Sequence, residues 1–262
     1  GDILFLAQDG IRTISGTDKI GDVNIASISK QVQRLVNELQ ESYDLRYLNS
    51  VVIKKKSQFR YFVSNGLIAD EGVGIIGGLR LNGDSTSMEY SELRGIRTAV
   101  TWVGYLNNDE TVLHGDYDGS VYKQESGNSF NGSSVVSIFS TPFLTFGSPI
   151  LRKQLRKLQI FTKYAGFFEI STSLSFDWLD SRQLAPNPFS GSVTTEGVLY
   201  DSTSALYDDP TSVYPPDVEY PVIDLNIEGS CKSVRYTFNT SSTSYPHTIQ
   251  GYITSFTPQG KR

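Results

Sequence analysis

The residues most capable of chemistry lie around one short acidic turn. Asp116 and Asp118 stand two residues apart in the segment GDYDG, as at the start of a calcium loop or as an acid–base pair for glycoside cleavage. A calcium loop of the EF-hand type also needs a third oxygen ligand, a distal glutamate and flanking helices, whereas the flanks here have the character of strands. Aspartates next to a glycine commonly form turns. We therefore interpret the pair as turn residues.

Other catalytic patterns are weak or missing in the sequence. Its two histidines, His114 and His247, have no histidine or cysteine neighbour at the spacing of zinc ligands. The signatures G-x-S-x-G, H-E-x-x-H and the P-loop do not occur. Gly72–Gly83 matches G-x-G-x-x-G by count, but a dinucleotide site also requires a βαβ unit, so a strand with bulges fits better. We expect no enzyme activity, no catalytic residue, no cofactor and no metal.

Positive charge gathers in two places. Lys54–Lys56 predict a solvated turn, with phosphate binding as the alternative. The second place is RKQLRKLQIFTK at 152–163, where an extended chain would put residues 152, 154 and 156 on one face and residues 153, 155 and 157 on the other. This segment is either an edge strand protected by charge or an intersubunit contact that meets an acidic loop. The candidate interface residues are Arg152, Lys153, Arg156, Lys157, Asp208 and Asp209.

The composition favours a structural β-protein. Of 262 residues, 15 are Tyr and 14 are Phe, which favour strands, and charged residues make up 19%, below the usual ~25%. The net charge of −5 argues against a general grip on nucleic acid, because phosphate neutralisation needs a basic footprint. Cys231 is the only cysteine, so no intrachain disulfide can form. No apolar run reaches 18 residues, and we expect no membrane-spanning helix.

Three segments share one pattern, an apolar run, then Asp-Gly or Asn-Gly, then another apolar run. The pattern predicts hairpins with type I′ turns at residues 9–10, 65–66 and 118–119, and its recurrence predicts propeller-like blades. One amphipathic helix is expected near 28–39, with Ser27 or Ser29 as its N-cap. The alternation of apolar residues over Phe168–Phe176 predicts a half-buried strand.

We expect the chain to have two parts. Residues 1–140 would form a propeller-like portion with the helix, and residues 141–262 a β-sandwich-like or platform portion. In the second part, Tyr200, Tyr207 and Tyr214 recur every seven residues, but the prolines among them exclude a helix and predict a turn-rich loop at 199–216. Because a strand follows Gly1-Asp2 at once, without an initiating methionine, we also expect either the C-terminal part of a longer chain or a processed product.

One long segment, Gly115–Lys157, resembles a pattern in tail proteins of short-tailed bacteriophages. Four motifs follow in order: Asp-Gly-x-Val-Tyr, Glu-Ser-Gly-Asn-Ser-Phe-x-Gly, Thr-Pro-x-Leu-x-Phe-Gly-x-Pro and Arg-Lys. The start, DILFLAQDGIRTIS, and the end, GYITSFTPQGKR, are similar to further segments of the same family, the nozzle or tail tubular protein B-like proteins. Members of that family are longer, with more β-sequence upstream, which leaves the number of blades open.

The resemblance implies a propeller-like ring domain, a sandwich platform and six copies around the tail axis. The implied partners are other copies of the chain, a tail adaptor resembling tail tubular protein A, tail fibres, and genomic DNA that passes without specific binding. The implied location is the virion tail, assembled in the host cytoplasm. An acidic chain suits a conduit, because like-charged walls repel phosphate and let DNA slide.

The predicted function is therefore that of a structural, non-enzymatic nozzle subunit whose ring retains DNA and passes it during ejection. The alternative is a carbohydrate-binding or depolymerising β-protein at the tail tip, which Asp116, Asp118 and the tyrosine-rich loop motivate.

Overall fold

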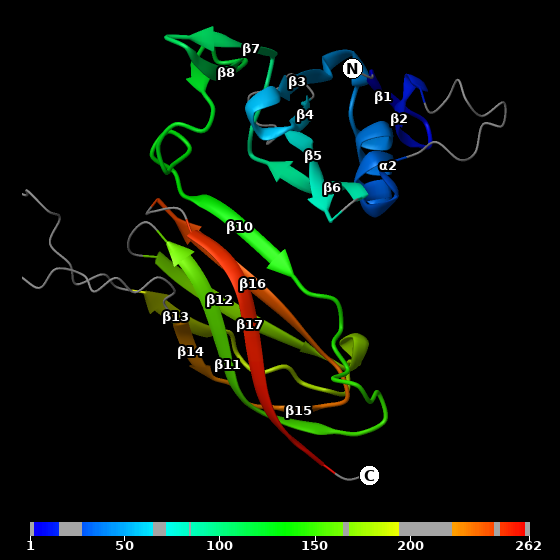
Figure 1. The fold of residues 1–262 in the computed structure, drawn as a ribbon, viewed down its shortest axis with the longest axis vertical. Helices are drawn as coiled ribbons and strands as arrows, with labels where there is room; N and C mark the ends of the chain where they lie inside the picture. The colour runs from blue at the N-terminus through cyan, green and yellow to red at the C-terminus, as the bar shows by residue number, and fades with distance from the viewer. Residues whose placement is uncertain are drawn as a thin grey trace, which may run out of the picture. The chain divides into compact units, whose positions relative to one another are not determined.

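The computed structural model describes residues 3–15, 28–64, 72–83, 85–164, 168–193, 222–243 and 247–259. The chain divides into two compact units, Gly1–Ser126 and Gly127–Arg262, which Figure 1 draws in blue to green and in green to red. Apart from short 3-10 turns, the elements of the described residues are seventeen strands and one α-helix. The expectation of a mainly β protein with one helix is confirmed.

The second unit begins earlier than the expected boundary between residues 140 and 141. β10 (Val135–Ser140) pairs antiparallel with β16 (Val234–Ser242) along its whole length. The ladder hydrogen bonds of β10 therefore tie it to the strands that follow it, so it belongs to unit 2. The expected turn-rich loop at 199–216 lies outside the described residues.

The described residues of unit 1 form three antiparallel sheets whose strands follow one another in sequence order. Propeller blades have this up-and-down connectivity, but other β-meanders share it, so the propeller-like portion stays a prediction. The first sheet is a hairpin, the second has four strands and the third has three. The strands are β1 (Leu4–Ala7) and β2 (Gly10–Thr13); β3 (Asn49–Ile53), β4 (Gln58–Val63), β5 (Val73–Asn82) and β6 (Ser85–Arg94); and β7 (Val100–Leu106), β8 (Asp109–Gly115) and β9 (Val121–Lys123).

The helix α2 (Gln33–Ser42) begins and ends later than the expected range of 28–39. The amide of Ile28 donates to the carbonyl of Ile11 on β2 at 2.9 Å, and the hydroxyl of Ser29 accepts from the Ile11 amide at 2.8 Å. Residues 28 and 29 therefore continue the pairing with β2 and cannot start a helix. Ser29 makes no side-chain cap, and Ser27 lies outside the described residues.

The apolar stripe of the helix is confirmed. Leu35, Val36 and Leu39 are buried and pack with Phe59 of β4 and Ile75 of β5 in the core of unit 1. None of the described helices is long and apolar enough to cross a membrane. The 3-10 turns of this unit are η1 (Lys30–Val32), η2 (Leu45–Tyr47) and η3 (Lys54–Lys56).

The turn at Asp118–Gly119 closes a hairpin as expected, but not as a type I′ turn. Gly119 has a φ of 88°, while Asp118 is not among the residues of positive φ. The Gly119 amide donates to the Asp116 carbonyl at 3.2 Å, and the Asp116 amide donates to the Ser120 carbonyl at 2.9 Å. This is a type I turn followed by a left-handed glycine, the usual three-residue hairpin loop.

The first hairpin departs from the type I′ expectation as well. Ala7 lies opposite Gly10, so its two turn residues are Gln8 and Asp9. The type I′ signature appears instead between β7 and β8, where the adjacent asparagines at 107 and 108 have φ of 52° and 64°. The turn predicted at residues 65–66 lies outside the described residues.

The glycine-rich segment forms the strand β5, but its pairing with β4 and β6 is continuous and has no bulge. The strand prediction is confirmed and the predicted bulges are wrong. Gly77 lies opposite Phe59 on β4 and Tyr90 on β6, and a Cβ atom at Gly77 would lie only 2.2 Å from Cε1 of the Phe59 ring. The glycine therefore provides space for an aromatic side chain on the sheet surface.

Unit 2 is a sandwich of two antiparallel sheets around one core. In one sheet the order is β10-β16-β12-β13; in the other, β11 lies between β17 on one side and β14 followed by β15 on the other. The remaining strands are β11 (Lys153–Tyr164), β12 (Phe168–Phe176), β13 (Phe189–Val193), β14 (Val222–Asn226), β15 (Ser230–Cys231) and β17 (His247–Pro258).

β12 alternates as predicted. Its even-numbered residues are buried in the core that both sheets share, and its odd-numbered residues face away from that core. Tyr236 and Phe238 of the neighbouring strand β16 also point into this core, where both contact Tyr252 of β17. The two layers are thus held together by aromatic contacts between β16 and β17.

The space at Gly77 gives a stability prediction. Gly77→Ala should lower the free energy of unfolding of unit 1 by about 1–3 kcal/mol, because the new methyl group overpacks the Phe59 ring. Gly78→Ala is the matched control, since its Cβ would meet only Ser57 O, at 4.0 Å. Urea unfolding followed by Trp102 fluorescence in a Trp178→Phe background measures both; equal effects would contradict the packing role of Gly77.

Candidate functional site

The basic segment forms β11, which is an internal strand of its sheet. β11 pairs with β14 and β15 on one side and with β17 on the other. The interpretation as an edge strand protected by charge is therefore wrong. Edge protection has no purpose where both rows of backbone groups are already hydrogen-bonded.

A bulge changes which basic residues share a face. The β11–β17 register shifts between Leu155 and Lys157, which leaves Arg156 as the extra residue. Lys153 and Leu155 are buried, Arg156 is exposed, and the next buried residue is Leu158. Lys157 therefore does not share a face with Leu155, as a regular strand would require.

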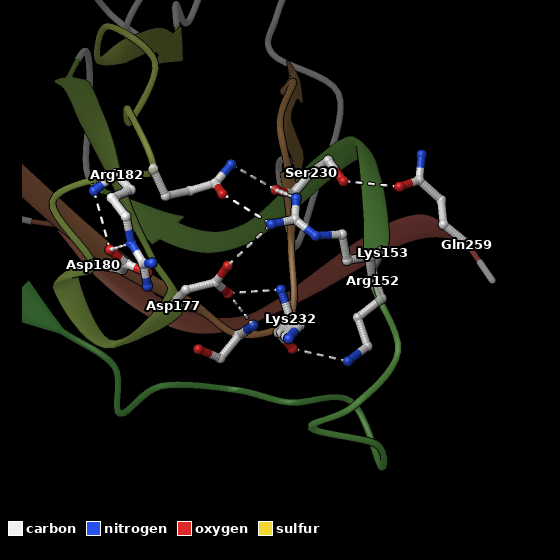
Figure 2. A network of polar contacts seen from close by, with 10 residues as sticks. Arg152, Lys153, Asp177, Asp180, Arg182, Ser230, Lys232 and Gln259 are labelled. Atoms are coloured by element: carbon white, nitrogen blue, oxygen red, sulfur yellow. Dashed lines mark hydrogen bonds and ion pairs between the residues drawn. The ribbon is translucent and has the colours of Figure 1, made fainter. Parts of the chain in front are cut away.

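Arg152 is the centre of a polar network at the start of β11 (Figure 2). Its Nη1 donates to the Ser230 carbonyl at 3.2 Å, and its Nη2 donates to Gln183 Oε1 at 3.0 Å and lies 3.9 Å from Asp177 Oδ2. The Arg152 carbonyl accepts from the Gln259 amide at 2.7 Å. Arg152 thus connects the β15 strand, the segment after β12 and the end of β17.

Lys153 is buried in the same network, with 2% of its surface exposed. Its Nζ donates to the Lys232 carbonyl at 2.9 Å and to the Ser148 carbonyl. Burial lowers the pKa of Lys153, because desolvation disfavours the charged ammonium. Its side chain holds two loop carbonyls, a structural role inside unit 2.

Asp177 closes the network from the other side. It opens η4 (Asp177–Leu179), in which the three residues have φ of 46°, 55° and 67°. This left-handed conformation costs about 1–2 kcal/mol per residue. Asp177 Oδ1 accepts from the amides of Lys232 and Ser233 at 2.7 and 2.9 Å, and the Asp177 amide donates to the Ser233 carbonyl at 3.0 Å. These bonds fix the turn against the corner between β15 and β16.

The other two predicted residues, Arg156 and Lys157, lie away from this network. Lys157 Nζ donates to Asp224 Oδ2 at 2.8 Å, and this hydrogen bond lowers the pKa of the Asp224 carboxyl. Arg156 is exposed and makes a long contact of 3.5 Å to Thr257 Oγ1. Asp208 and Asp209 lie outside the described residues, so their contact with the basic segment stays a prediction.

The acidic turn of unit 1 is held by an arginine. Arg97 Nη2 donates to Asp116 Oδ2 at 2.6 Å, and Arg97 lies 3.8 Å from Asp118 Oδ2. The hydrogen bond from Arg97 lowers the pKa of Asp116, whereas a general acid for glycoside cleavage needs a raised pKa. The geometry favours the interpretation of both aspartates as turn residues.

The remaining motifs resolve into structural contacts. Lys54–Lys56 form the exposed turn η3, where Lys55 pairs with Asp109 at 3.0 Å and Lys56 with Glu125 at 2.7 Å. His114 stacks on Tyr122 and His247 stacks on Phe168. Desolvation lowers the pKa of both histidines. Among the described residues, no three His, Cys, Asp or Glu side chains gather as a metal site would require.

Two functional features were not predicted from the sequence, the distant partners of Asp177 and the exposed position of Trp178. Asp177 accepts hydrogen bonds from the amides of Lys232 and Ser233, which lie 55 and 56 residues later in the chain. No local sequence pattern predicts a partner at that distance. Trp178, 56% exposed on the left-handed turn, carried a weak signal, since it is one of two tryptophans and follows directly on the alternating strand.

Comparisons with known proteins add little to this site. No protein-family model matches the chain, and no curated protein matches it. Among solved structures, the chain is similar to a glycoside hydrolase family 43 arabinoxylan arabinofuranohydrolase from Bacillus subtilis, in complex with cellotetraose, at 10% identity and a TM-score of 0.22. The match covers 80% of this chain and 52% of that chain, so this chain spans about half its length. A likeness this weak supports no enzyme activity.

The network gives a second stability prediction. Asp177→Ala should lower the free energy of unfolding of unit 2 by about 2–4 kcal/mol, because two part-buried backbone amides lose their acceptor. Asp180→Ala is the matched control; its carboxylate serves the exposed Arg182, and little change is expected. Urea unfolding followed by Trp178 fluorescence in a Trp102→Phe background measures both variants. Similar losses in the two would refute the role given to Asp177.

The acidic turn gives a pH prediction. A depressed folded-state pKa means that Asp116 stabilises the fold above the pKa of an unfolded aspartate, about 3.9, and that this contribution is lost as pH falls through the folded value. Asp116→Asn should therefore destabilise unit 1 at pH 7, and the difference from wild type should shrink below about pH 4. An Asp116→Asn variant as stable as wild type at pH 7 would contradict the pairing with Arg97.

Proposed function

We propose that this chain is a structural, non-enzymatic subunit of the tail nozzle of a short-tailed bacteriophage. Copies of the chain, six in the implied ring, form a conduit that retains the genome and passes it during ejection. A tail adaptor resembling tail tubular protein A and the tail fibres are its proposed neighbours in the virion tail, which is assembled in the host cytoplasm. DNA is a passing cargo here and not a specific ligand.

The observation that supports the proposal is the structural role of Gly115–Lys157, the segment that resembles the nozzle proteins. Its motifs contain glycines at 119, 127, 132 and 147, and all four have φ between 78° and 88°. The motif residues Leu144 and Phe146 pack against the core of the sandwich. The shared pattern therefore encodes turns and core contacts, as a pattern that specifies architecture should.

The charge of the molecule agrees with a conduit. A net charge of −5 offers no general grip on phosphate. The buried basic residue Lys153 is occupied by loop carbonyls, and Arg152 by Ser230 and Gln183. Both serve the inside of unit 2, so their side chains are not available to retain DNA.

Ring formation requires a heterologous contact, in which different surfaces of neighbouring copies meet. Of the predicted interface residues, Arg156 is the best placed, because the bulge exposes its guanidinium and its contact with Thr257 is long. We propose that it meets the acidic pair Asp208 and Asp209 of the adjacent copy, with Lys157 beside it. Depolymerisation has less support, since Arg97 pairs with Asp116 and lies near Asp118.

Native mass spectrometry and negative-stain images of the purified chain test this proposal. We expect rings of six copies, and we expect Arg156→Glu to reduce the ring fraction several-fold at equal concentration. Adding Asp208→Lys and Asp209→Lys to that variant should restore rings, because the charges are then exchanged. Arg182→Glu is the control, since Arg182 is 88% exposed and pairs within its own turn. A chain that stays monomeric at high concentration would contradict the proposed nozzle function.

A further inference from the structure

The outward face of one sandwich sheet carries an unusual set of side chains. On β12 and β16 the residues that do not face the core are small, polar and uncharged over most of their length. Charge is confined to Glu169 near one end of this face and Arg235 near the other. The uncharged members, which we call the hydroxyl face, are Ser171, Ser173, Ser175, Thr237, Asn239 and Ser241.

The strand register sets these side chains in rows across the sheet. Ser171 on β12 lies between Asn239 on β16 and Ser190 on β13, and Ser173 lies opposite Thr237. The next strand continues the second row, because Ser140 Oγ of β10 lies 2.9 Å from Thr237 Oγ1. Neighbouring strands are about 4.8 Å apart. Across β13, β12 and β16 the face therefore presents a regular array of hydroxyl and amide groups. Along its β10 margin it also carries two exposed apolar side chains, Ile138 opposite Asn239 and Val136 opposite Ser241.

An aromatic group stands at the Arg235 end of the array. The Arg235 guanidinium lies 5.1 Å from the centroid of the Phe143 ring, and that ring is 6.1 Å from the ring of Trp178. Ser175 lies opposite Arg235, so this stack adjoins the hydroxyl face. The left-handed turn anchored by Asp177 keeps Trp178 56% exposed.

These properties decide between the classes of occupant. Nucleic acid would need a basic footprint, and the face has one arginine, whose guanidinium already lies over Phe143. Protein interfaces are depleted in serine, and serine and threonine are under-represented among residues that contribute most to binding. A neutral face of hydroxyl and amide groups next to an exposed indole complements a neutral ligand with many hydroxyls and apolar C–H surfaces. Those are the properties of a saccharide.

We propose that the hydroxyl face and Trp178 form a saccharide-binding surface on unit 2. One sugar ring packs its C–H face on the indole, and the following units exchange hydrogen bonds with the serine, threonine and asparagine side chains. The surface is separate from Asp116 and Asp118 and involves no bond cleavage. It does not rest on the nozzle proposal, because a chain that forms no ring could still bind saccharide through it.

An array of purified bacterial lipopolysaccharides, capsular polysaccharides and neutral glucans tests the proposal on the whole chain. Titration calorimetry with the best arrayed saccharide then compares variants. We expect Trp178→Ala to weaken binding about tenfold or more, through loss of the stacking contact. Asn239→Val should weaken binding several-fold, since valine suits a strand but cannot exchange hydrogen bonds. Trp102→Ala is the matched control, because Trp102 is the other tryptophan, 45% exposed, in unit 1.

A second measurement does not depend on removing Trp178. In a Trp102→Phe background all tryptophan emission comes from Trp178, and saccharide binding should protect it from acrylamide quenching. The proposal is overturned if no arrayed saccharide binds, if Trp178→Ala and Trp102→Ala lose binding equally, or if binding leaves the quenching unchanged. A change of oligomeric state in Asn239→Val, without loss of saccharide binding, would instead identify a contact between copies and also overturn it.

Discussion

The carboxylate of Asp177 holds the end of the sandwich where four segments meet. Its two hydrogen bonds to the amides of residues 232 and 233 fix the corner between β15 and β16, and its second oxygen lies near Arg152 at the start of β11. Through Arg152 and Ser230 the same network reaches Gln259, at the end of β17. These interactions offset the strain of three left-handed residues in succession. They also determine where Trp178 stands.

The two faces of β12 have different roles, one in the core of the sandwich and the other in the proposed saccharide surface. Its buried residues join the core that holds the two sheets together, and its serines lie on the opposite face and do not pack into that core. A subunit of a closed ring needs such a rigid core, because the contacts between neighbouring copies must have the same geometry at every position of the ring. The second property leaves one sheet surface available for a ligand. The proposed ring contact and the proposed saccharide site thus lie on different surfaces of unit 2.

Sequence reasoning worked where the signal was local. The alternation over Phe168–Phe176 and the apolar stripe of α2 follow from side-chain period alone. The strand β5 was predicted from the absence of a βαβ unit around its glycines. Sequence reasoning failed where residues far away in the chain determine the local structure. Ser29 binds Ile11 and delays the helix, pairing with β17 places the bulge at Arg156, and β14 and β17 together make β11 internal. The turn at Asp118–Gly119 was located correctly, whereas the first hairpin turns one residue earlier than predicted, at Gln8 and Asp9, and neither turn is of type I′.

The central claim is that Asp177 fixes the sandwich corner from which Trp178 and the hydroxyl face are positioned. Native-state hydrogen exchange at the amides of Lys232 and Ser233 tests it most directly, because both donate to this one carboxylate. The account predicts that both amides exchange as slowly as those of the core strands, through global opening of unit 2. Exchange at the rate of exposed loop amides would contradict the account, because the corner would then open independently of the core.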